Sequence, residues 1–147
     1  MKDEKIIKEL YRLAKDNGGE LRPGDVVKAA RPKSSPLHKC FQWDDSKAAQ
    51  AYRLWQARQL IRVTVEYIGP DDAAVPMRVF VSLTSDRKNK GGGYRTTLDV
   101  MSNRKQREQL LADALAEMEL FEEKYSALKE LAEVIGAMRS ARKKVAA

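Results

Sequence analysis

The sequence predicts an α+β fold that is mainly α, with a winged-helix-like head followed by a long C-terminal helix that forms a coiled coil. Three observations support this prediction. Apolar residues recur at helical spacing before residue 61, the spacing becomes the two-residue alternation of strands over residues 62–83, and a heptad pattern follows residue 102. At 147 residues we expect one domain with an appendage. The predicted parts are a head at 1–85, a flexible basic loop at 86–101 and an oligomerisation helix at 102–147.

The head begins with two predicted helices. The first spans residues 3–16, where Ile6, Leu10 and Leu13 share one face, and it ends at Gly18 because glycine readily adopts the left-handed conformation. A short helix follows at residues 26–30. It ends at Arg31, because a residue that precedes proline avoids helical geometry.

A third helix is predicted over residues 44–61 after a turn-rich connector. Asp44, Asp45 and Ser46 precede it and offer capping side chains. Its apolar positions cover more than one stripe, so we expect a well-packed central helix with one narrow polar edge. The apolar positions are Ala48, Ala51, Tyr52, Leu54, Trp55 and Ile61, and the polar edge comprises Gln50, Arg53, Gln56 and Arg58. Leu37, Phe41 and Trp43 are expected to pack beneath the neighbouring helices.

An antiparallel hairpin is predicted over residues 62–83. Two alternating segments flank a turn at residues 69–72, and Pro76 places the second strand at an edge because proline donates no ladder hydrogen bond. The lysines, arginines and glycines of the next segment then indicate a mobile basic loop.

The C-terminal segment carries eight apolar residues at alternating steps of three and four. A continuous helix from Ser102 to Lys144 would be about 60 Å long. Such a helix must fold back or pair with another chain, and a break near Gly136 is an open alternative to a single rod. Because the seam is long and has charged edges, we expect self-association, with a symmetric dimer as the default, over packing within the chain. The seam residues are Leu111, Ala114, Met118, Phe121, Tyr125, Leu128, Ala132 and Ile135.

The charge distribution favours an anionic partner. The net charge is +7, and residues 1–62 hold 14 basic and 8 acidic side chains, residues 63–105 hold 7 and 5, and residues 106–147 hold 7 and 8. Nucleic acid is the commonest partner of such a basic excess, although acidic proteins and plain solubility are also consistent with it. No apolar run approaches the length of a membrane span, and no secretion signal is visible, so we expect a cytoplasmic protein without membrane contact.

Enzymatic and metal-binding patterns are poorly represented. Cys40 and His38 are too few to build a zinc site, and no third residue orients His38 as a base for a Cys40 nucleophile. Gly91, Gly92 and Gly93 are not followed by the Gly-Lys-Ser/Thr of a phosphate-binding loop. The sequence therefore predicts a non-enzymatic protein without a cofactor or metal.

The order of helix, short helix, longer helix and hairpin is shared by many small αβ domains. One of them is the winged helix-turn-helix, whose third helix enters the major groove of double-stranded DNA. Lys47 and Gln50 are the predicted base readers. The predicted phosphate contacts are Lys28, Arg31, Lys33, Arg53, Arg58 and Arg87, with Arg78 and Lys88 near the wing. We expect replacement of Arg53 and Arg58 by alanine to weaken binding and leave the fold intact.

Two segments of the chain carry a recognisable pattern. The first comprises residues 35–38, Phe41, residues 43–46 and 48–49, and residues 52–62; the second comprises residues 79–83 and 92–95 and leads into a helix that begins near Leu110. Both segments resemble a family of short, mostly uncharacterised proteins encoded by tailed phages and prophages. The likeness covers roughly residues 5–135. It implies a phage or mobile-element setting and action in the bacterial host cytoplasm, in transcription regulation or viral DNA handling.

An alternative from a different class is a protein-interaction module. A virion-assembly component or an inhibitor of a host factor would use the C-terminal helix as its binding element, with Leu111, Met118 and Phe121 contacting a phage or host protein.

Overall fold

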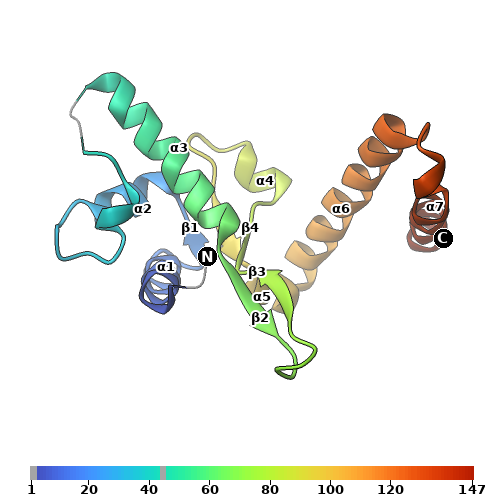
Figure 1. Cartoon of the computed structure of the whole chain (residues 1–147), viewed down its shortest axis with the longest axis horizontal. Helices are drawn as coiled ribbons and strands as arrows, with labels where there is room; N and C mark the ends of the chain where they lie inside the picture. The colour runs from blue at the N-terminus through green and yellow to red at the C-terminus, as the bar shows by residue number, and fades with distance from the viewer. Residues whose placement is uncertain (1–2, 44–45) are drawn as a thin grey trace. The chain divides into compact units, whose positions relative to one another are not determined.

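The computed structural model describes residues 3–43 and 46–147, and it divides into two compact units, residues 1–104 and 105–147 (Figure 1). The chain is mainly helical with a few short strands, which confirms the predicted α+β class. No helix among the described residues is long and apolar enough to span a membrane.

The described residues of unit 1 form three principal helices and three short helical segments. Asp3 caps the first helix by accepting a hydrogen bond from the backbone N–H of Lys5, and Ser46 caps α3 by accepting one from Ala49. The predicted caps Asp44 and Asp45 lie outside the described residues. The bounds are α1 Glu4–Asp16, α2 Pro23–Ala30, the 3₁₀ helix η1 His38–Cys40, α3 Lys47–Val63, α4 Thr84–Arg87 and α5 Thr97–Ser102.

The predicted hairpin is present and directly follows α3. It pairs β2, Val65–Ile68, with β3, Val75–Arg78. A second sheet has the order β1–β5–β4, formed by Glu20–Leu21, Tyr94–Thr96 and Phe80–Val81. Val79 alone separates β3 from β4, and its N–H donates to the carbonyl oxygen of Thr64 at 3.1 Å. The segment that returns from the hairpin therefore contributes to both sheets.

The prediction of a flexible basic loop at residues 86–101 is wrong. This segment holds β5 and α5, and the buried carboxylate of Asp86 accepts hydrogen bonds from the Arg95 guanidinium. Strand β5 is only 3 residues long and follows three glycines, so it has no recognisable alternation. The head consequently extends beyond residue 85, and β1 pairs with β5 instead of with the hairpin.

A single apolar core holds unit 1 together. It joins the inner faces of α1, α2 and α3 to the connector and to the strands, and it includes Leu37 and Phe41 as expected. Burial of this apolar area is the main stabilising contribution to the fold. Its most buried members include Leu10, Leu21, Val26, Ala30, Leu37, Ala57, Ile61, Val79 and Phe80.

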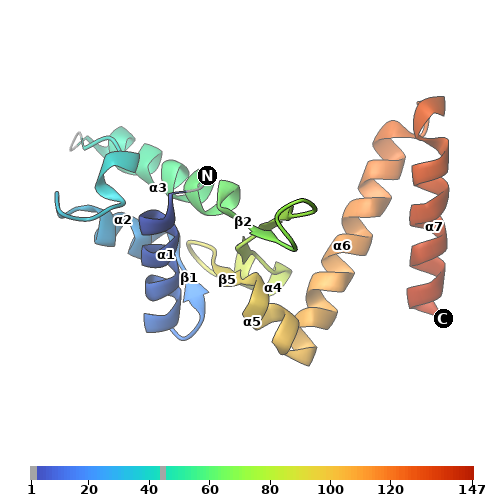
Figure 2. The same ribbon diagram turned by 60° about the horizontal axis from the view of Figure 1, so that its bottom comes forward.

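Unit 2 is a helical hairpin rather than a single rod (Figure 2). Helix α6, Arg104–Tyr125, ends before the turn at Ser126; the 3₁₀ helix η2, Lys129–Leu131, and α7, Ala132–Ala146, follow. The break therefore precedes Gly136. Glu122 pairs with Arg139 and Arg142 across the two helices, so the chain folds back on itself.

The predicted heptad seam is only partly covered in this hairpin. Ile135 is buried, whereas Met118, Phe121 and Tyr125 are half-buried and the rings of Phe121 and Tyr125 meet at 4.8 Å. Ala114 is also half-buried, but Leu111 and Leu128 are exposed. Of the two geometries that the sequence left open, a single rod and a hairpin, the structure has the hairpin, and its turn divides the predicted seam between two helices.

Candidate nucleic-acid interface

Helix α3 has a buried face and a solvent-exposed face that differ from the predicted ones. Arg53, Ala57, Leu60 and Ile61 are buried toward the core. The opposite face presents Tyr52 and Trp55, which are 47% and 51% exposed. The aromatic residues that we expected in the core therefore lie at the surface, and an arginine expected at the polar edge lies inside.

Arg53 is a structural residue, so its assignment as a phosphate contact is wrong. Only 1% of it is exposed, its Nη1 donates to the carbonyl oxygen of Gln42 at 3.1 Å, and its guanidinium lies 5.5 Å from the ring centroid of Trp43. Replacement by alanine would leave a cavity and remove a buried charge-assisted hydrogen bond, which contradicts the expectation of an intact fold.

Trp43 anchors the connector that leads into α3. Its ring stacks on that of His38 at 4.9 Å, and its indole N–H donates to the His38 carbonyl oxygen. Nδ1 of His38 lies 2.9 Å from the carbonyl oxygen of Ala30, which ties the connector to the end of α2. These contacts hold in place the chain segment before α3.

The exposed side of α3 carries basic residues and no acidic ones. The sequence from Lys47 to Val63 contains four basic residues and no aspartate or glutamate. Lys47 and Gln50 are exposed at the N-terminal end and Arg58 is half-buried. Arg62, exposed near the C-terminal end, was missed by sequence reasoning, although its spacing of seven from Trp55 places both on one helical face.

The other predicted contacts are exposed but lie on different elements. Lys28 belongs to α2, Arg31 and Lys33 to the connector and Arg78 to β3, whereas Arg87 and Lys88 lie at the end of α4. Two of these arginines also have contacts within the chain. The Arg31 guanidinium lies 5.8 Å from the Trp43 ring centroid, and Arg87 donates to the Ser82 carbonyl and the Thr84 hydroxyl.

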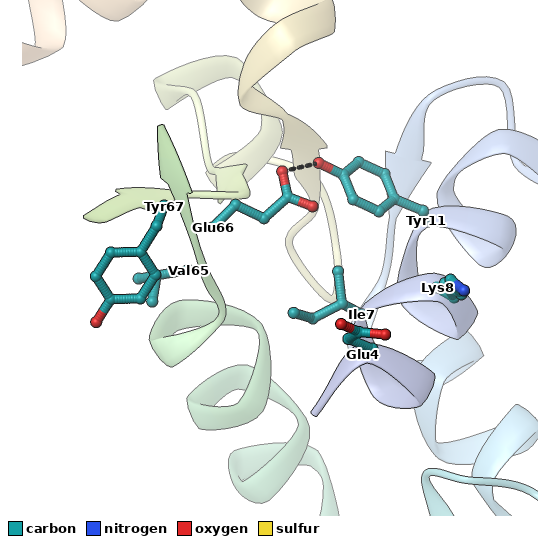
Figure 3. A pocket seen from close by; sticks show the side chains of 7 residues that line it. All are labelled: Glu4, Ile7, Lys8, Tyr11, Val65, Glu66 and Tyr67. Atoms are coloured by element: carbon teal, nitrogen blue, oxygen red, sulfur yellow. Dashed lines mark hydrogen bonds between the residues drawn. The ribbon is translucent and has the colours of Figure 1, made fainter. Parts of the chain in front are cut away.

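A hydrogen bond from Tyr11 to Glu66 attaches the β2–β3 hairpin to α1. The distance between the hydroxyl and Oε2 is 2.9 Å, and burial together with this carboxylate raises the pKa of Tyr11 to about 12 (Figure 3). Tyr11 therefore remains a hydrogen-bond donor at neutral pH. A cavity of 380 Å³ adjoins this bond, lined by Glu4, Ile7, Lys8, Tyr11, Val65, Glu66 and Tyr67.

The two residues weighed as a nucleophile and base have structural surroundings. Burial raises the pKa of the Cys40 thiol, which opposes formation of the reactive thiolate. The His38 ring is engaged by Trp43 and the Ala30 carbonyl. Among the described residues, no cluster of histidine, cysteine, aspartate and glutamate has the composition needed to hold a metal ion.

Comparison with known proteins adds no relative: no protein-family model matches the chain, and no curated protein or solved structure matches it. The exposed face of α3, with its aromatic pair and its basic side chains, is the best-defined candidate site.

Proposed function

We propose that this protein is a non-enzymatic nucleic-acid-binding protein, with DNA as its ligand, that binds through the exposed face of α3. The observation that carries this proposal is the combination on one helix of two exposed aromatic rings, several basic side chains and no carboxylate. Phosphates are bound by lysine and arginine without fixed geometry, and aromatic rings add contact area to the bases or sugars.

The neighbouring elements support a binding surface larger than one helix. The order α1, α2, α3, β2 and β3 corresponds to a winged helix-turn-helix, in which the hairpin contacts DNA beside the third helix. Tyr67, on the hairpin, is 53% exposed, and Arg78 is exposed on the paired strand. The hairpin in this proposal is the wing, with Lys28, Arg31 and Lys33 as additional phosphate contacts.

The test is the salt dependence of DNA binding by the full chain and matched charge variants. Fluorescence anisotropy at several salt concentrations measures how many counterions binding releases. We expect the double variant Arg58→Gln, Arg62→Gln to bind more weakly, with a log–log salt slope shallower by about 1 to 2. Arg107→Gln removes an exposed arginine from α6. It is the control that measures how much the loss of one positive charge away from α3 weakens binding.

Equal affinity of the double variant and the control would exclude the α3 arginines from the interface. Absence of binding to any nucleic acid at low salt would refute the proposed function. Circular dichroism of each variant establishes that it has kept the fold.

The proposal extends to the assembly and setting of the protein. We propose that it acts as a dimer or higher oligomer, with unit 2 supplying the contact, because Leu111, Leu120 and Leu128 are 45–63% exposed there. The resemblance of its sequence segments to tailed-phage proteins supports a role in transcription regulation or viral DNA handling in the bacterial cytoplasm.

The same exposed leucines favour a second candidate function, a protein-interaction module that binds a phage or host protein through α6 and α7. Met118→Asp tests this function because it places a charge within the predicted contact. Unchanged oligomerisation and unchanged capture of a purified candidate partner would exclude Met118 from such an interface.

A further inference from the structure

The exposed rings of Tyr52 and Trp55 form a stacked pair on α3. Their centroids are 5.6 Å apart and the planes differ by 14°, so the rings are nearly parallel. About half of each residue is exposed to solvent. Neither residue belongs to the apolar core of unit 1.

The preceding turn of α3 leaves the N-terminal side of the pair open. Side chains on a helix lean toward its N-terminus, so each ring lies over the residue four positions earlier. Those residues are Ala48 and Ala51, both exposed and both with a single methyl group. A planar ligand can therefore approach the rings without meeting a longer side chain from the preceding turn.

Cationic side chains follow the pair along the same helix. Arg58 and Arg62 stand three and seven positions after Trp55, on the same side of α3. Within the described part of the chain, neither forms an ion pair with a carboxylate. The helix thus presents a stacking surface beside two cations, which are the two elements of single-stranded nucleic-acid recognition.

A DNA duplex offers no free base face on which Tyr52 or Trp55 could stack. In a duplex the faces of the bases are covered by neighbouring base pairs, and only their edges are accessible in the grooves. An unpaired base has a free face, and an aromatic side chain stacks on it with little dependence on base identity. A protein partner could also bury aromatic residues, but a helix face that carries Lys47, Arg58 and Arg62 and no carboxylate is better matched to a polyanion.

We propose that Tyr52 and Trp55 bind an unpaired base of a single-stranded nucleic acid, while Arg58 and Arg62 contact its phosphates. This inference rests on the proposed nucleic-acid function. It adds that the α3 site prefers single-stranded to double-stranded nucleic acid. Single-stranded DNA and RNA share the base and phosphate chemistry, so the site accommodates either.

The experiment compares three probes with the full chain: a fluorescein-labelled 20-nucleotide DNA strand of mixed sequence, the RNA strand of the same sequence, and the corresponding DNA duplex. Anisotropy titrations at one low salt concentration give the three dissociation constants. We expect the single strands to bind about tenfold more tightly than the duplex, the order of magnitude of one stacked base. The ratio of the DNA to the RNA constant identifies the preferred source.

Two substitutions of Trp55 separate stacking from apolar contact. Trp55→Leu keeps an apolar side chain but removes the aromatic face, and we expect it to weaken single-strand binding by about tenfold. Trp55→Phe keeps an aromatic face and should retain most of the affinity. The loss on Trp55→Leu should be larger for the single strands than for the duplex, whose bases offer no free face, and circular dichroism establishes that both variants keep the fold.

The possible outcomes distinguish this inference from the proposed function. Equal binding of duplex and single strands, or a Trp55→Leu variant that binds single strands like the wild type, would overturn the stacking site. Duplex binding that depends on Arg58 and Arg62 would then remain as support for the proposed function. No binding to any of the three probes would overturn both.

Discussion

Units 1 and 2 differ in how they bury their apolar side chains. Unit 1 encloses a continuous core built from three helices and the strands, with many side chains less than 2% exposed. In unit 2, Ile135 is the one buried apolar residue among those described, and α6 contains none. In a hairpin of two helices, each helix buries one apolar stripe against the other and leaves its remaining faces exposed to water. The comparison indicates that unit 1 is stabilised by its own core, whereas unit 2 buries little apolar surface and leaves Leu111, Leu120 and Leu128 exposed.

The largest expected effect of substitution is in the core of unit 1. Phe80 is 1% exposed and its ring lies 5.8 Å from that of Tyr11. Phe80→Ala should lower the free energy of unfolding by about 3–5 kcal/mol, because it removes apolar contacts and leaves a cavity. Urea denaturation followed by circular dichroism measures the loss. Val145→Ala, at an exposed position near the end of α7, is the comparison and should change stability by less than about 0.5 kcal/mol.

The next effect concerns the buried ion pair within unit 1. Asp86 is 1% exposed, pairs with Arg95 at 2.8 Å and accepts the backbone N–H of Leu83. Asp86→Asn should cost about 2–3 kcal/mol of stability, since it removes a charge-assisted hydrogen bond and leaves Arg95 uncompensated. The control is Asp16→Asn, which weakens an exposed pair with Arg12 and should cost under about 1 kcal/mol. Equal losses in the two variants would show that the Asp86 pair is not structural.

A smaller effect is expected on self-association through unit 2. Leu111→Asp places a charge on an exposed apolar position of the predicted seam. We expect the dissociation constant of the dimer to rise about tenfold, equivalent to about 1.4 kcal/mol, in sedimentation-velocity measurements. Ala116→Asp adds the same charge at another exposed position of α6 and should have no effect. A wild-type protein that is monomeric at high concentration would contradict the proposed assembly.

The smallest effect is a pH dependence of the helical hairpin. Hydrogen bonds from Arg139 and then Arg142 hold the pKa of Glu122 below its ordinary value near 4.5. The stabilisation is therefore present above the unfolded-state pKa and is lost as the pH falls through the lowered native pKa. Glu122→Gln should reduce the melting temperature slightly at neutral pH, and the reduction should shrink as the pH falls below 4.5. If the melting temperatures of the wild type and of Glu122→Gln differed by the same amount at every pH in this range, the charge of the Glu122 carboxylate would be ruled out as the cause.

Helix α3 shows what the pattern of residue types predicts and what it does not. The existence of the helix, its Ser46 cap and the hairpin after it follow from capping chemistry and from the change of period. The orientation of the helix does not follow, because both of its faces mix apolar and polar residues. Trp55 by itself suggests burial, and Arg53 by itself suggests exposure. In the structure Arg53 is buried by its tertiary contacts with Gln42 and Trp43, and Trp55 is left at the surface.

The missed strand β5 has a different physical reason. Its partners, β1 and β4, are each 2 residues long and come from distant parts of the chain, so the sheet arises from tertiary pairing rather than local pattern. The burial of Asp86 beside Arg95 likewise depends on the packed fold and leaves no local pattern in the sequence. In unit 2 the heptad spacing predicts a set of seam residues but carries no information on the turn at Ser126 that divides them.

The most direct test of the proposed interface is to map it by NMR. Backbone amide shifts of ¹⁵N-labelled full-length protein would be recorded during titration with a short single-stranded DNA, together with the indole N–H signal of Trp55. We expect the largest changes at residues 48–62 and at the Trp55 indole, with smaller changes on the β2–β3 hairpin and none on α7. Changes confined to α6 and α7, with residues 48–62 unaffected, would contradict the assignment of α3 as the nucleic-acid interface.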